Sequence, residues 1–179
     1  MIALGIDPDT KATGMAVVSI GAVPKVLYVA TAPVKTTLSV EERIRIMNAI
    51  VSMELGSFPY GIAVERIAVE GQEKYPRDRV RPNDLIHLAQ VSGMAAAHAQ
   101  LAYPLASLWI PTPRTWKGQV PKNVHQKRIL GQLGLTEKLE GVEGAQGMTK
   151  TQRGHVIDAI GLALWVAKIP ARPTKVLPK

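Results

Sequence analysis

The first thirty residues alternate short apolar runs with turns rich in glycine, proline and aspartate. Residues 2–6 form an apolar run that ends at Asp7, and residues 14–20 and 25–30 form two more. The segments that join these runs have the composition of turns. The pattern predicts a meander of three short strands, with a carboxylate at the end of the first.

The apolar spacing changes to that of a helix over residues 40–55, where Ser39 and Glu42 have the spacing of an N-terminal capping box. Strands followed by alternating helices and strands predict an α/β fold: a mixed sheet, antiparallel in its opening meander, with helices on both faces. The remaining predicted elements are a strand within 61–71, a charged loop over 72–82, an alanine-rich helix over 83–101, a strand over 105–110, a basic helix over 123–133, a mobile loop over 136–150 and an apolar helix over 155–167.

Composition narrows the class of protein. The chain has 179 residues, of which 46% are hydrophobic, and this suits one domain of ordinary size over residues 1–167. The basic, proline-rich tail over residues 168–179 is predicted to be disordered. The absence of cysteine excludes disulfides, thiolate zinc sites and cysteine nucleophiles. The start of the sequence lacks a basic signal region, and no apolar run approaches the about 20 residues that span a membrane. We therefore expect a soluble, cytoplasmic protein that neither spans nor binds a membrane.

The charge balance indicates a polyanionic partner. The chain has 22 lysine and arginine residues against 14 aspartate and glutamate residues, a formal net charge of +8. Nucleic acid is the commonest partner of a small protein this basic, the alternative being a merely basic soluble protein. Aromatic residues make up only 4% of the chain, which argues against a single-strand binder built on many stacking platforms.

Two carboxylates stand at the ends of apolar strands. Asp7 closes the first strand, where an aspartate is also ordinary turn chemistry, and Glu70 closes the strand predicted within 61–71. Glu65 competes with Glu70, but the two are five residues apart and face opposite sides of a continuous strand. Glu70 is favoured because it lies at the carboxyl end of its strand, where ligands of open α/β sheets bind.

A histidine and an aspartate interrupt the last apolar helix. His155 and Asp158 are three residues apart and share one helix face. A carboxylate among apolar side chains is costly unless it is paired or binds a metal, the alternative being a helix start where solvent tolerates both groups. Three acid ligands and an imidazole from distant segments suit Mg²⁺ or Mn²⁺ rather than zinc. Together with the basic charge, they predict a metal-dependent nuclease.

These residues, in this order, resemble the RuvC-type Holliday-junction resolvases of the ribonuclease H-like superfamily, over about residues 1–167. The resemblance is carried by Gly5-Ile6-Asp7-Pro8, Thr13-Gly14, Ala68-Val69-Glu70, and His155 with Asp158. The segments most similar to the bacteriophage branch are Val69-Glu70-Gly71-Gln72, Asn83-Asp84-Leu85 and Trp116-Lys117-Gly118-Gln119-Val120-Pro121-Lys122. The family usually has glycine in the turn where this chain has Asp9.

The resemblance implies an endodeoxyribonuclease that resolves four-way DNA junctions by paired, symmetric nicking. It implies that Asp7, Glu70, His155 and Asp158 are the catalytic residues and the ligands of a two-metal Mg²⁺ or Mn²⁺ site. It also implies a homodimer, for which the small residues of the helix over 83–101 offer a candidate interface. The implied setting is the cytoplasm of a bacterium or of an infected host cell.

The predicted DNA contacts form two basic sets, one on the charged loop and one on and before the basic helix. Lysine and arginine there would neutralise phosphates without reading sequence. Tyr75 is the aromatic residue nearest to the place where the family carries a junction-wedging side chain. The sets are Lys74, Tyr75, Arg77, Arg79 and Arg81, and Lys117, Lys122, His125, Lys127 and Arg128.

Two other functions remain open from the sequence. Another ribonuclease H-like nuclease, acting on RNA–DNA hybrids or flaps, would share the metal site and need no dimer. An actin-like or sugar-kinase-type ATPase can begin with a similar phosphate loop. Such ATPases are normally about twice this length, and the sequence shows no second phosphate loop.

Overall fold

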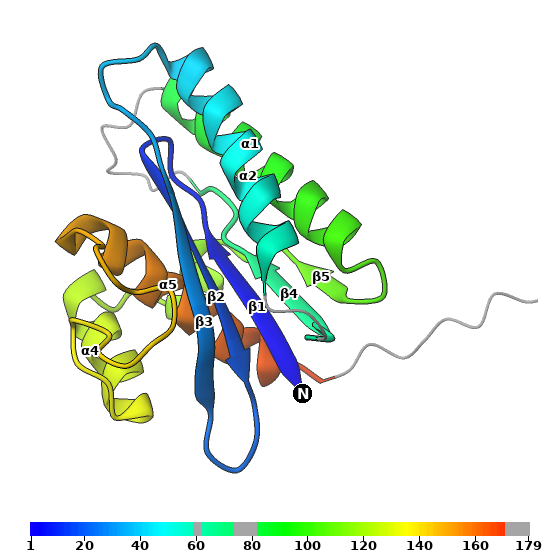
Figure 1. Ribbon diagram of the computed structural model, residues 1–179, viewed down its shortest axis with the longest axis vertical. Coiled ribbons are helices and arrows are strands. Elements are labelled where there is room, and N and C mark those ends of the chain that lie inside the picture. The colour runs from blue at the N-terminus through cyan, green and yellow to red at the C-terminus, as the bar shows by residue number, and fades with distance from the viewer. Residues whose placement is uncertain (59–61, 74–81, 171–179) are drawn as a thin grey trace, which may run out of the picture.

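The computed structural model describes residues 1–58, 62–73 and 82–170. Within them, a five-stranded sheet has the spatial order β3-β2-β1-β4-β5 (Figure 1). The predicted mixed sheet is confirmed, because the first three strands pair antiparallel and the last two extend the sheet parallel to β1. The strands are β1 (Ile2–Asp7), β2 (Ala12–Ser19), β3 (Lys25–Pro33), β4 (Arg66–Val69) and β5 (Ser107–Trp109).

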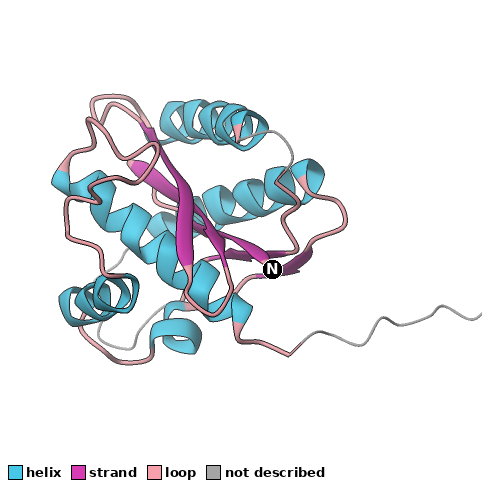
Figure 2. Cartoon of the chain, turned by 60° about the horizontal axis from the view of Figure 1, so that its bottom comes forward, coloured by secondary structure: helices cyan, strands magenta, loops and turns pink. Residues whose placement is uncertain are grey.

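Helices cover both faces of this sheet, as predicted (Figures 1 and 2). The helices α1 (Val40–Ser57) and α2 (Pro82–Ala102) lie on one face. On the other face lies α5 (Lys150–Ala167), with α4 (Lys122–Leu133) packed against it. Because successive strand residues point to opposite faces, the buried apolar side chains divide into two clusters, one beneath each helical layer.

The register of β1 and β4 brings two strand ends together. These strands are parallel, with Ile6 opposite Val69. The backbone N–H of Glu70 donates to the carbonyl oxygen of Ile6 at 2.9 Å. Asp7 and Glu70 therefore leave the sheet side by side, at the carboxyl ends of neighbouring strands.

The close approach of α5 to the sheet depends on two glycines. A Cβ on Gly5 would overlap the carbonyl oxygen of Ala159, and a Cβ on Gly14 would overlap the backbone of His155. Only glycine leaves room for the helix backbone at these two places. The first turns of α5 are consequently held against the end of β1, where Asp7 lies.

The structure corrects the start of the last predicted helix and adds a short helix that was not predicted. The last helix begins at Lys150 and not at His155, with Thr149 as its N-cap and Gln152 completing a capping box. Its first turns are polar and so carry no apolar period. No helix was predicted between the strand over 105–110 and the basic helix over 123–133, yet Pro113 starts a short helix there, α3 (Pro113–Lys117). Proline suits the first turn of a helix, where its missing N–H costs nothing.

The predicted mobile loop over 136–150 is instead packed against the protein. Leu139, Val142 and Ala145 are buried at intervals of three residues. Successive turns bury them, with the Val142 N–H bonded to the Leu139 carbonyl and the Ala145 N–H to that of Val142. The carbonyl oxygen of Glu143 accepts from the N–H of Val29, so this loop also covers part of the edge of β3. Its glycines and charges hid this spacing in the sequence.

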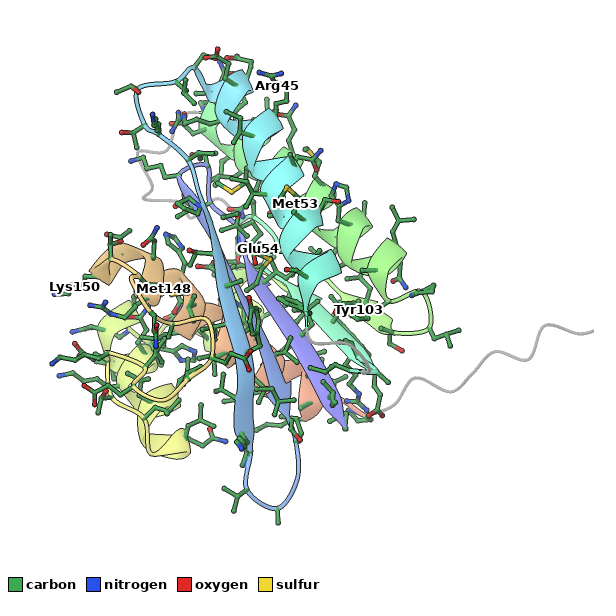
Figure 3. The ribbon with its side chains drawn as sticks, in the orientation of Figure 1. Arg45, Met53, Glu54, Tyr103, Met148 and Lys150 are labelled. Carbon is green, nitrogen blue, oxygen red and sulfur yellow. The ribbon has the colours of Figure 1, made fainter. Side chains whose placement is uncertain are left out.

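The outer side of α1 faces solvent. Met53 is 72% exposed there, whereas Met47 is buried beneath the helix (Figure 3). In the described part of the chain, no helix is both long enough and apolar enough to cross a membrane. The proposed tail over 168–179 lies mostly outside the described residues, of which the last is Pro170.

Candidate active site

Three buried carboxylates lie at one end of the sheet. Asp7 closes β1, Glu70 follows β4, and Asp158 projects from the third turn of α5. Their exposed fractions are 5%, 9% and 1%. Asp158 is close enough to raise the pKa of both other carboxyls through its negative charge. Buried acids require compensating partners, so the contacts of each one define the site.

Asp7 is paired with His155. The Nδ1 atom of His155 lies 2.7 Å from Oδ2 of Asp7, and its Nε2 atom lies 3.8 Å from Oδ2 of Asp9. Burial raises the pKa of Asp7, with a further contribution from the charge of Asp158, while the hydrogen bond to His155 opposes the rise. Burial works against the imidazolium form of His155, but the Asp7 carboxylate outweighs it and raises the pKa of His155. His155 is therefore a half-buried hydrogen-bond partner of Asp7, and it is not an exposed residue at a helix start.

Glu70 is held by two residues of α3. The indole N–H of Trp116 donates to Oε2 of Glu70 at 2.7 Å, and Nζ of Lys117 lies 3.3 Å from the same oxygen. Burial, reinforced by the charge of Asp7, raises the pKa of Glu70 to about 7. The contacts with Lys117 and Trp116 oppose this rise without cancelling it. Near neutral pH, Glu70 is thus poised between its charged and neutral forms.

Asp158 is held by two residues of α4. Nζ of Lys122 lies 2.8 Å from Oδ2, and Nε2 of Gln126 donates to Oδ1 at 3.0 Å. The same Gln126 nitrogen donates to the carbonyl oxygen of Gly154 at 2.9 Å, which ties α4 to the backbone of α5. Burial lowers the pKa of Lys122, but the charge and hydrogen bond of Asp158 outweigh it and the pKa is raised. Lys122 therefore stays an ammonium ion at neutral pH.

The side chains gathered at this site have the donor atoms that a divalent cation requires. Three buried acids and an imidazole match the hard ligands that Mg²⁺ and Mn²⁺ accept. Positive charge already lies against Glu70 and Asp158, through Lys117 and Lys122, and the imidazole of His155 lies against Asp7. In the conformation described, no three acidic or histidine side chains of the described residues are arranged to hold one ion. The donor atoms of the site therefore suit a divalent cation. In the arrangement described, lysine ammonium groups lie against two of the acids.

The structure brings the four predicted site residues together and separates Glu65 from them. Glu65 precedes β4, and its carboxylate accepts from the N–H of Ile2 and lies 3.6 Å from the chain's amino group. That is the opposite end of β1 from Asp7. The choice of Glu70 over Glu65 therefore agrees with the geometry.

The predicted DNA-contact residues divide into four groups. Lys117 and Lys122 turn toward the carboxylates. The ring of His125 packs edge-on against Trp116, with their centres 4.9 Å apart, and Lys127 is exposed on α4. Arg128 is also exposed on that helix. The first set, which is Lys74, Tyr75, Arg77, Arg79 and Arg81, lies outside the described residues.

Sequence reasoning missed Trp116 and Gln126 as parts of the site. Gln126 lies one turn after Lys122 on α4, so both reach the same carboxylate, and this spacing was a usable signal. Trp116 gave none, because its contact with Glu70 spans 46 residues. Its helix, α3, is also too short to show a period.

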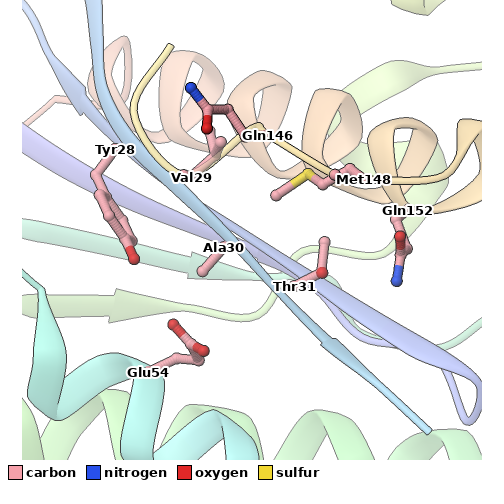
Figure 4. A pocket seen from close by; sticks show the side chains of 10 residues that line it. Tyr28, Val29, Ala30, Thr31, Glu54, Gln146, Met148 and Gln152 are labelled. Atoms are coloured by element: carbon pink, nitrogen blue, oxygen red, sulfur yellow. The ribbon is translucent and has the colours of Figure 1, made fainter. Parts of the chain in front are cut away.

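A hollow beside β3 is separate from the carboxylates. It has a volume of about 250 Å³ and lies between α1, β3 and the loop before α5 (Figure 4). Tyr28 and Glu54 point toward each other there, and burial raises the pKa of both side chains. Glu54 is the one acidic residue among its described lining, so this hollow lacks the charge cluster found at the end of β1.

Comparison with known proteins identifies the fold. No family model and no curated protein sequence matches the chain. Among solved structures, the chain is similar to Thermus thermophilus RuvC in complex with a Holliday junction substrate, with a TM-score of 0.65, 24% identity and 93% of each chain covered. A second Thermus thermophilus RuvC structure matches with a TM-score of 0.59, 21% identity and the same coverage. The chain therefore has a RuvC-like, ribonuclease H-like fold.

Proposed function

We propose that this protein is a metal-dependent endodeoxyribonuclease that resolves four-way DNA junctions by paired, symmetric nicking. The observation that carries the proposal is the convergence of Asp7, Glu70 and Asp158, all buried, at one end of a RuvC-like sheet. The net charge of +8 supports a nucleic-acid substrate. The Thermus thermophilus protein of the same fold was solved with a Holliday junction substrate.

Asp7, Glu70, His155 and Asp158 would hold the Mg²⁺ or Mn²⁺ ions. Divalent ions in such sites activate a water molecule and stabilise the leaving oxygen of a phosphodiester. The protein itself buries the three acids and holds each of them through a hydrogen bond or an ion pair. Gln126 orients Asp158 through its side-chain amide.

In the proposed enzyme, the two lysines of the site also contact the phosphates of the DNA. Lys117 and Lys122 balance the carboxylates in the structure described here. The Lys122 side chain is 54% exposed, so its long stem can turn outward while its charge stays near the acids. Both ammonium groups would then neutralise phosphates of the bound strand, with Lys127 and Arg128 extending the basic surface along α4.

The proposed homodimer uses the outer face of α2. Four of the small residues of this helix, Ser92, Ala95, Ala96 and Ala99, are buried within the subunit. Ala89, Gly93 and Ala97 are exposed and share one helix face. Ile86 and Leu101 flank that face with exposed fractions of 56% and 77%. We expect sedimentation to show a dimer at micromolar concentration, and a monomer even with junction present would contradict this.

The setting remains part of the proposal. We place the protein in the cytoplasm of a bacterium or of an infected host cell. Within the resolvases we assign it to the bacteriophage branch, on the strength of Val69-Glu70-Gly71-Gln72, Asn83-Asp84-Leu85 and the segment Trp116–Lys122.

The test is a cleavage assay with four substrates. A labelled four-way junction, a matched duplex, a flap and an RNA–DNA hybrid are incubated with the protein, with and without Mg²⁺ or Mn²⁺. We expect paired nicking of the junction that requires the metal. Preferential cleavage of the hybrid would instead identify another ribonuclease H-like nuclease.

Variants test the assignment of the residues. Asp7→Asn, Glu70→Gln and Asp158→Asn should each abolish cleavage and keep junction binding, because phosphate contacts come from lysine and arginine. Glu65→Gln is the matched control and should cleave normally. An inactive Glu65→Gln together with an active Glu70→Gln would show that the wrong glutamate was chosen.

A further inference from the structure

A groove lies along the outer side of α5. Its volume is about 290 Å³, and it lies between α5 on one side and α3 and α4 on the other. Trp116, His125 and Trp165 supply aromatic surface, and Gly161 and Leu164 form part of its apolar lining. This size is at the lower end of ligand pockets and suits a small planar group.

The base of the groove is closely packed. Trp116 is buried and packs directly on α5, because a Cβ on Gly161 would lie only 2.8 Å from its ring and 2.5 Å from Ile129. Its indole N–H is fixed by Glu70. Trp165 is half-buried and leaves part of its ring accessible. A planar ligand would therefore meet one fixed aromatic wall and one accessible aromatic face.

The rim of the groove is cationic. Lys117, Arg128 and Lys168 line it, and its described lining includes no aspartate or glutamate. The buried Nε2 atom of His125 has no hydrogen-bond partner among the described residues. Aromatic walls, basic side chains and an unsatisfied imidazole nitrogen together match a nucleotide, with its flat base, hydrogen-bonding edge and phosphates.

The groove and the candidate active site share Trp116 and Lys117. Trp116 lines it and also binds Glu70. Asp158, Gly161, Trp165 and Lys168 follow one another on α5 at intervals of three, four and three residues, and so share one helix face. At 1.5 Å per residue, Trp165 is about 10 Å along the helix from Asp158. A nucleotide next to the cleaved phosphate can reach that far once its base leaves the stack.

We infer that this groove takes one unstacked base of the DNA strand being cut, stacked on Trp165, with Arg128 and Lys168 on its flanking phosphates. This inference rests on the proposed function. It gives the enzyme a contact with the base itself close to the cut, in addition to contacts with the backbone. The cut would then be favoured where a base is easily unstacked, as at the branch of a junction.

The test combines a protein variant with removal of single bases. Junctions carrying one abasic site, placed in turn within three nucleotides of the cleaved phosphate, are titrated by fluorescence anisotropy in EDTA against the wild type and Trp165→Ala. If a base occupies the groove, Trp165→Ala and the abasic site at one position each weaken binding by about fivefold to hundredfold. When Trp165→Ala is combined with the abasic site at that position, junction binding should be weakened no more than by the larger of the two single changes. Trp165→Phe should retain most of the wild-type affinity.

Two controls decide the outcome. Tyr103→Ala truncates a partly buried aromatic residue near the end of α2 and should leave junction affinity unchanged. Effects of Trp165→Ala and base removal that multiply at every position would overturn the inference. Junction cleavage by the wild type in Mn²⁺ is measured on the same preparation. Cleavage without coupling refutes the groove alone, whereas a wild type that neither binds nor cuts junctions refutes the proposed function and this inference with it.

Discussion

Neutralising Glu70 should stabilise the protein while it abolishes cleavage. Burial and neighbouring negative charge raise the pKa of Glu70 from the ordinary 4.5 to about 7. The charged form is therefore disfavoured in the folded state. At pH 8 this corresponds to about 3 kcal/mol of lost stability. Glu70→Gln removes the charge and keeps an oxygen for the indole N–H of Trp116. It leaves Lys117 without its partner, so we expect a net gain of about 1–3 kcal/mol at pH 8.

The sign of the pH dependence follows from the direction of the shift. Between pH 4.5 and 7 the folded chain binds more protons at Glu70 than the unfolded chain does. Wild-type stability therefore falls as the pH rises through this window. The advantage of Glu70→Gln should be small at pH 5 and reach its full size at pH 8. Urea unfolding in EDTA, followed by circular dichroism at both pH values, measures the difference directly.

Glu65→Gln is the matched control for this experiment. Glu65 is exposed and contacts the chain's amino group, so its replacement should change stability by less than about 1 kcal/mol. The reasoning is refuted if Glu70→Gln is less stable than the wild type by the same amount at pH 5 and pH 8. That result would mean that the contacts of Glu70 outweigh the cost of burying its charge.

Further predictions concern His155 and two glycines, Gly5 and Gly56. His155→Ala should lose most activity in Mg²⁺ and in Mn²⁺, whereas His155→Asp should stay active and shift its preference toward Mg²⁺, which cleavage rates in each metal will check. Because the Asp7 carboxylate raises the pKa of His155, the stability lost in His155→Ala should be larger at pH 6 than at pH 9, as urea unfolding in EDTA can show. Gly5→Ala should destabilise by several kcal/mol or prevent folding, since its Cβ overlaps the Ala159 carbonyl. A Cβ at Gly56 in α1 would meet open space, so Gly56→Ala should instead raise the free energy of unfolding by about 0.5–1 kcal/mol, as urea unfolding can measure.

The acids of the site were predictable from the sequence because each one breaks an apolar pattern. Asp7 and Glu70 end apolar strands, and Asp158 interrupts an apolar helix. These signals are local in the sequence. A carboxylate within an apolar segment is costly to bury unless it is paired or binds a metal, so it indicates a functional site. The same reasoning predicted the order of strands and helices, because the hydrophobic periods of the core elements are strong.

The partners of the acids were not predictable in the same way. Lys122 and Lys117 look like ordinary surface cations in the sequence, and only the packing of α3 and α4 on α5 aims them inward. The loop over 136–150 failed for a related reason. Its glycines at positions 141, 144 and 147 adopt positive φ and allow tight turns, which bury the apolar residue two positions before each of them. Neither fact follows from a helix or strand period.

The acids and the cations of the site come from different layers of the fold. Asp7 and Glu70 lie at strand ends of the sheet, and Asp158 lies on α5. Lys117 lies on α3 and Lys122 on α4, and these helices pack on the outer side of α5. A set of buried charges is rarely the most stable filling for such a place, since apolar side chains of similar volume are often as good or better. The raised pKa of Glu70 is the consequence expected of this cost. Folding alone therefore does not account for three acids at this end of the sheet, which supports the proposed role of these acids in binding divalent cations.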